Sequence, residues 1–182
     1  MVHYYDTIVF SYFFYNPKVK NRFSPIDNAQ ITPAISFFSI EEFLHTNFKL
    51  NASNWGNPKK YYELWEELEL FRPFFETIND IKMEDLNTNF SKMISRIINH
   101  ANQKGLDYNT LYSEHRIPEM MDIVHLIIAD MAGASFFITA DGKFAFFEDI
   151  TDLPLKNVTE VIILDRNNFE EKERKVYLNH SP

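Results

Sequence analysis

Two aspartates that lie 19 residues apart have types and positions that could support chemistry. Asp122 lies near the start of a predicted helix, and Asp141 follows the apolar segment 134–140, which is typical of a buried strand. A carboxylate on a helix and another at the carboxyl end of a strand can converge above a sheet. Such a pair could bind a hard cation if other parts of the chain supply further acids.

Each of the two aspartates also has a purely structural interpretation. Asp122 is early in its helix, where the macrodipole stabilises an anion whatever the function. Asp141 and Gly142 stand between FFITA and KFAFF, a pattern that is typical of a β-hairpin turn. The preceding helix and the length of the crossover favour a strand in a parallel sheet over the hairpin.

The rest of the composition excludes most other reactive groups. The chain has no cysteine, which excludes disulfides, thiolate nucleophiles and thiolate zinc sites. Its four glycines fit neither phosphate-binding glycine motif, and its six histidines are dispersed. No G-x-S-x-G elbow is present. Carboxylates therefore remain as the reactive groups, and they suit a hard metal ion.

Asp6 interrupts the apolar segment 2–15, VHYYDTIVFSYFFY. One interpretation is a single long buried strand in which Asp6 points to solvent. The other is a short strand that ends near Asp6, followed by a helix that packs on the sheet. In the second case Asp6 lies at the carboxyl end of a strand beside a helix N-terminus, where open α/β folds bind ligands.

Glu42 lies in a segment that is predicted to change from strand to helix. Residues 31–38 have strand-like or buried character, and the segment from Ser39 to Leu44 is predicted to open a helix. Ser39 and Glu42 also fit the S-x-x-E capping box, in which the glutamate reaches back to the amide of the cap residue. The capping box alone would account for Glu42.

The segment 51–105 is predicted to be mainly helical. Pro58 suits the first turn of a helix that reaches residue 78 and that Pro73 must kink or divide. A second helix is indicated by apolar residues at helical spacing, and Gly105 ends it. These apolar residues are Phe90, Met93, Ile94, Ile97, Ile98 and Ala101. We expect a helical pair that is larger than a usual connection between α/β units.

Length and charge bound the class of protein. At 182 residues, the chain is long enough for one domain with a sizeable core, and aromatic residues make up 16% of it. The net charge of −8 argues against coating nucleic acid by bulk electrostatics, although Lys18, Lys20 and Arg22 form a local basic loop. No apolar run is long enough to span a membrane and no signal peptide is apparent, so we expect a cytoplasmic protein.

Three segments together resemble the PIN domain family, which includes the toxin ribonucleases of bacterial toxin–antitoxin pairs. The segments are YYDTIVFSYFF, ISFFSIEEF and DIVHLIIADMAGASFFITADGKF. Asp6, Glu42, Asp122 and Asp141 match the four acidic positions of the family pattern, and Thr139 matches its threonine. Ile8 departs from the pattern, because many members have asparagine there.

The resemblance implies a fold, a reaction and partners. The fold would be α/β, a three-layer α/β/α PIN-like domain over residues 1–182 with a mostly parallel central sheet and a helical insertion at about 51–105. The activity would be an endoribonuclease that uses Mg²⁺ or Mn²⁺ held by the four acids and leaves a 5′-phosphate and a 3′-hydroxyl. RNA would be the substrate, an antitoxin protein would be a partner, and the chain would form a homodimer.

Two alternatives stay open from the sequence alone. A PIN-like domain that no longer cuts RNA could serve as a binding or scaffold module through its helical insertion. An unrelated α+β protein, in which Asp141 only shapes a hairpin turn, is the other. Carboxyl groups that lie on different faces of the molecule would exclude the PIN-like interpretation.

Overall fold

A computed structural model describes residues 1–15, 32–50, 58–71, 75–150 and 152–164. In this part of the chain five strands form one sheet in the order β3-β2-β1-β4-β5, and every neighbouring pair is parallel. The strands are β1 (Val2–Tyr5), β2 (Thr32–Ser36), β3 (Glu76–Ile78), β4 (Phe136–Thr139) and β5 (Glu160–Ile163). The predicted α/β class with a parallel central sheet is confirmed.

The first strand ends directly before Asp6. Helix α1 (Thr7–Tyr15) follows at once, and its first helical hydrogen bond runs from the amide of Phe10 to the carbonyl of Asp6. The interpretation as a short strand followed by a helix is therefore confirmed, and the single long strand is wrong. Asp6 is thereby fixed at the carboxyl end of the central strand, where parallel sheets bind ligands.

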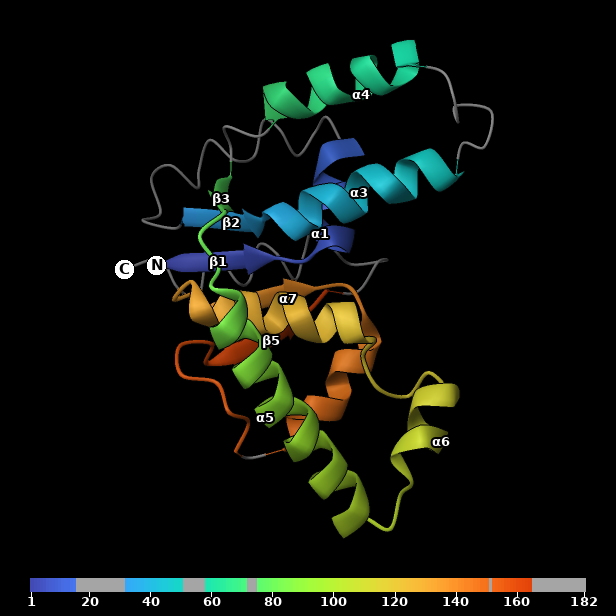
Figure 1. Ribbon diagram of the computed structural model, residues 1–182, viewed down its shortest axis with the longest axis vertical. Coiled ribbons are helices and arrows are strands. Elements are labelled where there is room, and N and C mark those ends of the chain that lie inside the picture. The colour runs from blue at the N-terminus through green and yellow to red at the C-terminus, as the bar shows by residue number, and fades with distance from the viewer. Residues whose placement is uncertain (16–31, 51–57, 72–74, 151, 165–182) are drawn as a thin grey trace.

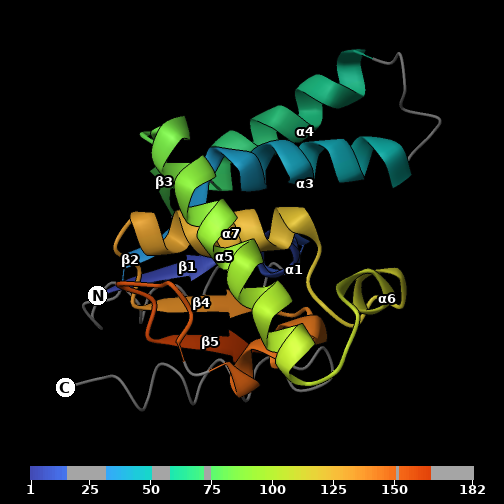
Figure 2. The same ribbon diagram turned by 60° about the horizontal axis from the view of Figure 1, so that its bottom comes forward.

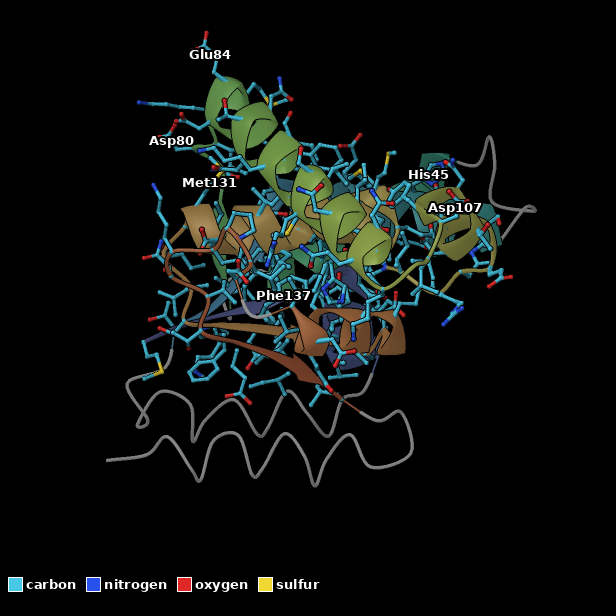
Figure 3. All side chains as sticks on the ribbon, turned by 90° about the horizontal axis from the view of Figure 1, so that it is seen from below. His45, Asp80, Glu84, Asp107, Met131 and Phe137 are labelled. Atoms are coloured by element: carbon cyan, nitrogen blue, oxygen red, sulfur yellow. The ribbon has the colours of Figure 1, made fainter. Side chains whose placement is uncertain are left out.

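Helices cover both faces of the sheet, which gives three layers (Figure 1). Adjacent side chains of a strand point to opposite faces, so Tyr4 and Tyr5 enter different cores. Tyr5 packs with α1, α3 (Phe37–Leu50) and α4 (Pro58–Phe71), whereas Tyr4 packs with α5 (Met83–Gln103), α7 (Met120–Met131) and the 3₁₀ helix η4 (Gly142–Asp149). Phe137 of β4 lies in the second core, between the sheet and these helices (Figure 3).

The segment between α3 and α5 differs from its prediction. Helix α4 ends at Phe71, and the residues expected to continue it, Glu76–Ile78, instead form the edge strand β3 beside β2. Pro73 itself lies outside the described residues. The second predicted helix is confirmed as α5, whose apolar face packs on α7 (Figure 2). Gly105 follows its end with φ +68, a conformation that favours glycine.

The last third of the described chain carries Asp122 and Asp141. Helix α6 (Tyr108–Ser113) leads to α7, which begins after Glu119 and therefore two residues later than Pro118, the predicted start. Strand β4 pairs in parallel with β1 and β5, and η4 follows Asp141. The hairpin interpretation of Asp141–Gly142 is thus wrong, because KFAFF turns into a helix and does not return along β4.

The basic loop with Lys18, Lys20 and Arg22 lies outside the described residues. Among the helices that are described, none has the length and apolar character needed to cross a membrane.

Candidate carboxylate site

Asp6 forms the buried centre of the site, with 2% of its surface exposed. Its Oδ1 accepts a hydrogen bond from the amide of Thr7 at 2.7 Å, and its Oδ2 accepts one from Thr139 Oγ1 at 2.7 Å. Burial raises the pKa of Asp6 above its ordinary value, although nearby His125 and the two hydrogen bonds oppose this effect. The carboxyl group is therefore held in one orientation at the ends of β1 and β4.

Asp141 is joined to Asp6 through Thr139. The Thr139 hydroxyl that donates to Asp6 also accepts a hydrogen bond from the amide of Asp141 at 3.0 Å. The Asp141 carboxylate caps η4 by accepting from the amide of Lys143 at 3.0 Å. The T-x-D sequence thus places its threonine and aspartate on one chain of hydrogen bonds that leads to Asp6.

Asp122 approaches from α7. It is the third residue of that helix, and its Oδ2 accepts a hydrogen bond from the amide of Glu119 at 2.8 Å as part of a capping box. Burial, then the charge of Asp6, and further the charge of Asp141 raise the pKa of Asp122 to about 7. Asp122 therefore caps its helix and also lies within electrostatic reach of two other predicted site residues.

Glu42 approaches Asp6 from α3. Its Oε2 accepts hydrogen bonds from Thr7 Oγ1 at 2.6 Å and from His125 Nε2 at 3.1 Å. The hydrogen bond from His125 is the main cause that lowers the pKa of Glu42, so its carboxylate is ionised at neutral pH. The four acids predicted from the sequence therefore lie near the carboxyl ends of β1 and β4, and Glu42 is hydrogen-bonded to His125.

The capping box predicted for Ser39 and Glu42 is wrong. Helix α3 begins at Phe37, so both residues lie inside it. Ser36 caps the helix instead, because its Oγ accepts a hydrogen bond from the amide of Ser39 at 3.1 Å. This leaves the Ser39 and Glu42 side chains available to contact α7.

Thr7, His125 and Lys143 also contact the predicted acids, although they are not among the site residues predicted from the sequence. His125 was counted only as one of the dispersed histidines, although its i+3 spacing from Asp122 predicts the same helix face. Lys143 lies at the rim, with Nζ 3.1 Å from Glu119 Oε1 and 3.8 Å from Asp141 Oδ2. It places one positive charge next to the aspartates.

The donor chemistry of the site fits a hard divalent cation. The carboxylates offer only oxygen ligands, and the electrostatic effect of Asp6 and Asp141 on Asp122 is the repulsion that a cation would offset. In the described part of the chain, however, no three acidic or histidine groups are close enough together to hold an ion. Ion binding would therefore need the acidic side chains to move closer together.

Comparisons with known proteins agree with the architecture. No protein-family model matches the chain, and no curated protein matches its sequence. Among solved structures, the fold resembles a chain in the crystal structure of VapBC2 from Rickettsia felis bound to a DNA fragment from its promoter. The TM-score is 0.53 at 18% identity, over 86% of this chain and 98% of the other. At this identity the similarity shows the fold alone, an α/β fold with a five-stranded parallel sheet that is consistent with a PIN-like fold.

Proposed function

We propose that this protein is a metal-dependent endoribonuclease that hydrolyses RNA phosphodiester bonds. The observation that carries the proposal is the convergence of three aspartates from three chain segments. Asp6 follows β1, Asp141 follows β4, and Asp122 approaches from the N-terminus of α7. The hydrogen bonds through Thr139 and the mutual repulsion of the carboxylates support their common role.

Each acid has a defined role in the proposal. Asp6 and Asp141 would be direct ligands of Mg²⁺ or Mn²⁺, and Glu42 and Asp122 would complete the site directly or through water. Such an ion supplies positive charge to phosphate oxygens and makes a water molecule more acidic. Thr7 and Thr139 orient the Asp6 carboxylate by donating to its two oxygens. Lys143 can contact a substrate phosphate from the rim.

The similar structure also informs the biological setting. VapBC2 is a toxin–antitoxin complex and VapC is a PIN domain, which supports a toxin-type ribonuclease with an antitoxin partner. We propose that residues 1–182 form a single PIN-like domain with an insertion at about 51–105, that the protein acts in the cytoplasm, and that it forms a homodimer. The 5′-phosphate and 3′-hydroxyl products belong to the same proposal.

A cleavage assay tests the function. Purified protein is incubated with structured and single-stranded RNA in Mn²⁺ or in EDTA, alongside Asp6→Asn and Asp141→Asn. We expect cleavage only with Mn²⁺. Each variant should lose more activity than the roughly 10–100-fold that is typical when a residue that orients a metal ligand is replaced. Asp107→Asn is the matched control, because Asp107 is an exposed helix cap on α6. Cleavage that survives both site substitutions would refute the assignment.

Two observations favour a second candidate, a PIN-like binding or scaffold module that does not cut RNA. Within the described residues, no three potential ligands are already arranged around an ion position, and Glu42 is bonded to His125. In that case the protein would bind RNA or a protein partner with equal affinity in Mn²⁺ and in EDTA, and no RNA would be cleaved under either condition.

A further inference from the structure

We infer that His125 is a positioning residue. Its hydrogen bond holds the Glu42 carboxylate against Thr7. This inference rests on the proposed function, since it concerns how the four acids share an ion. Glu42 then has a supporting role beside the three aspartates. Neither the acidic motif nor the sequence position of His125 indicates this arrangement.

The histidine is held from both ends of its ring. His125 is fully buried, and its Nε2 lies 3.1 Å from Glu42 Oε2. Its Nδ1 lies 2.9 Å from the Tyr4 hydroxyl and 3.4 Å from Ser39 Oγ. The Tyr4 hydroxyl in turn donates to Ser36 Oγ at 2.8 Å. Residues of β1, β2 and α3 thus fix the ring of a residue on α7, and a ring so fixed can fix Glu42.

The direction of the bond to Glu42 follows from the chemistry of its two partners. The carboxylate of Glu42 is ionised and can only accept, so the hydrogen must be on His125 Nε2. The direction of this hydrogen bond is the same whether or not Nδ1 also carries a hydrogen. The Ser39–Glu42 spacing that resembles a capping box therefore has a different role, because both side chains face the two nitrogens of one imidazole.

The bond connects His125 to Asp6 through two residues. Glu42 Oε2 accepts from both His125 and the hydroxyl of Thr7, and the amide of Thr7 donates to Asp6 Oδ1 at 2.7 Å. Both hydrogen bonds to Glu42 fall on the same oxygen, Oε2. Without His125, the Glu42 side chain, which is 39% exposed, could rotate toward the aspartates or into solvent.

A set of three variants tests the positioning role. His125→Phe keeps a ring but removes the donor, whereas His125→Gln returns an amide N–H near the position of Nε2. His100→Phe is the matched control, because His100 is a buried histidine of α5 that packs against Phe146 of η4. The measurements are Mn²⁺ affinity and kcat and KM for RNA cleavage.

The expected result is a pattern that loss of packing would not produce. His125→Phe weakens Mn²⁺ binding or lowers kcat by about 10–100-fold, as for other residues that orient metal ligands. His125→Gln recovers most of this loss, KM changes little, and His100→Phe behaves as the wild type. Equal activity in His125→Phe and the wild type, or an equal loss in His100→Phe, would overturn the inference.

A spectroscopic measurement on the wild-type protein separates this inference from the proposed function and covers the case in which His125→Phe does not fold. Imidazole ¹H–¹⁵N correlation spectra should show a slowly exchanging Nε2–H for His125, and Glu42→Ala should abolish its protection. Absence of that signal in the wild type refutes the inference even if RNA is cleaved. Its presence in a protein that neither binds Mn²⁺ nor cleaves RNA would refute the proposed function while the His125–Glu42 bond stands.

Discussion

Replacing Asp122 with asparagine should stabilise the metal-free protein at pH 8. The pKa of Asp122 rises from its ordinary 3.8 to about 7, first because of burial and then because of the charges of Asp6 and Asp141. The ionised Asp122 therefore destabilises the folded state. This destabilisation grows as the pH rises from the pKa of Asp122 in the unfolded chain to its pKa in the folded protein. Asparagine removes the charge but keeps an acceptor for the amide of Glu119.

The size of the effect follows from the pKa difference. The difference between the ordinary pKa of 3.8 and the pKa of about 7 in the folded protein corresponds to about 4 kcal/mol, at about 1.36 kcal/mol per pH unit. Asp122 is only partly buried, and solvent screening reduces the stabilisation to on the order of 1–2 kcal/mol. For a chain of this length, that corresponds to an increase of about 3–6 °C in Tm at pH 8. Near pH 4 the gain should be small, because this pH is close to the ordinary pKa of 3.8 and the carboxyl of the folded protein is then protonated.

Thermal unfolding in EDTA at pH 4, 6 and 8 measures this gain. Asp107→Asn is the control, because Asp107 lies on the exposed surface at the start of α6 (Figure 3), where its carboxylate caps the helix. That variant should show no gain that increases with pH. The electrostatic reasoning is refuted if Asp122→Asn is less stable than the wild type at pH 8, or if its gain is the same at every pH.

Two further predictions concern Lys143 at the rim of the site and Asp130 near the end of α7. In the Asp6→Asn background, Lys143→Gln should reduce the salt dependence of single-stranded RNA binding by about 0.7 in the log–log slope, as expected for one lost phosphate contact, whereas Lys104→Gln should not. An unchanged slope would exclude Lys143 from the RNA interface. Asp130→Ala should lower the free energy of unfolding by about 2–3 kcal/mol, because the buried Oδ1 accepts from the amides of residues 156–158. A loss below about 0.5 kcal/mol in urea denaturation would contradict that role.

The sequence was informative where local pattern and topology agree. Asp6 and Asp141 could be placed because each follows a short apolar run, and parallel strands end at the same edge of the sheet. Tyr4 and Tyr5 are consecutive apolar residues, which is typical of a central parallel strand because both of its faces are buried. The two interpretations of Asp141–Gly142 could be separated because the crossover before β4 is typical of a parallel strand.

Other features depend on contacts between distant segments or on very short elements. Strand β3 has three residues, too few to show alternation, and its neighbour β2 supplies the hydrogen bonds that define it. The Ser39–Glu42 pair fits a capping box locally, and Ser36 takes the capping role by a shift of three residues. The bond between His125 and Glu42 joins residues 83 positions apart, which no local pattern could predict.

The most direct test of the central claim is Mn²⁺ binding followed by electron paramagnetic resonance, because it does not depend on knowing the RNA. The wild-type protein should bind Mn²⁺ stoichiometrically, and Asp6→Asn, Asp122→Asn and Asp141→Asn should each weaken binding by at least about tenfold. Asp107→Asn should bind as the wild type does. Binding that is absent from the wild type, or unchanged in all three site variants, would contradict a metal centre formed by these aspartates.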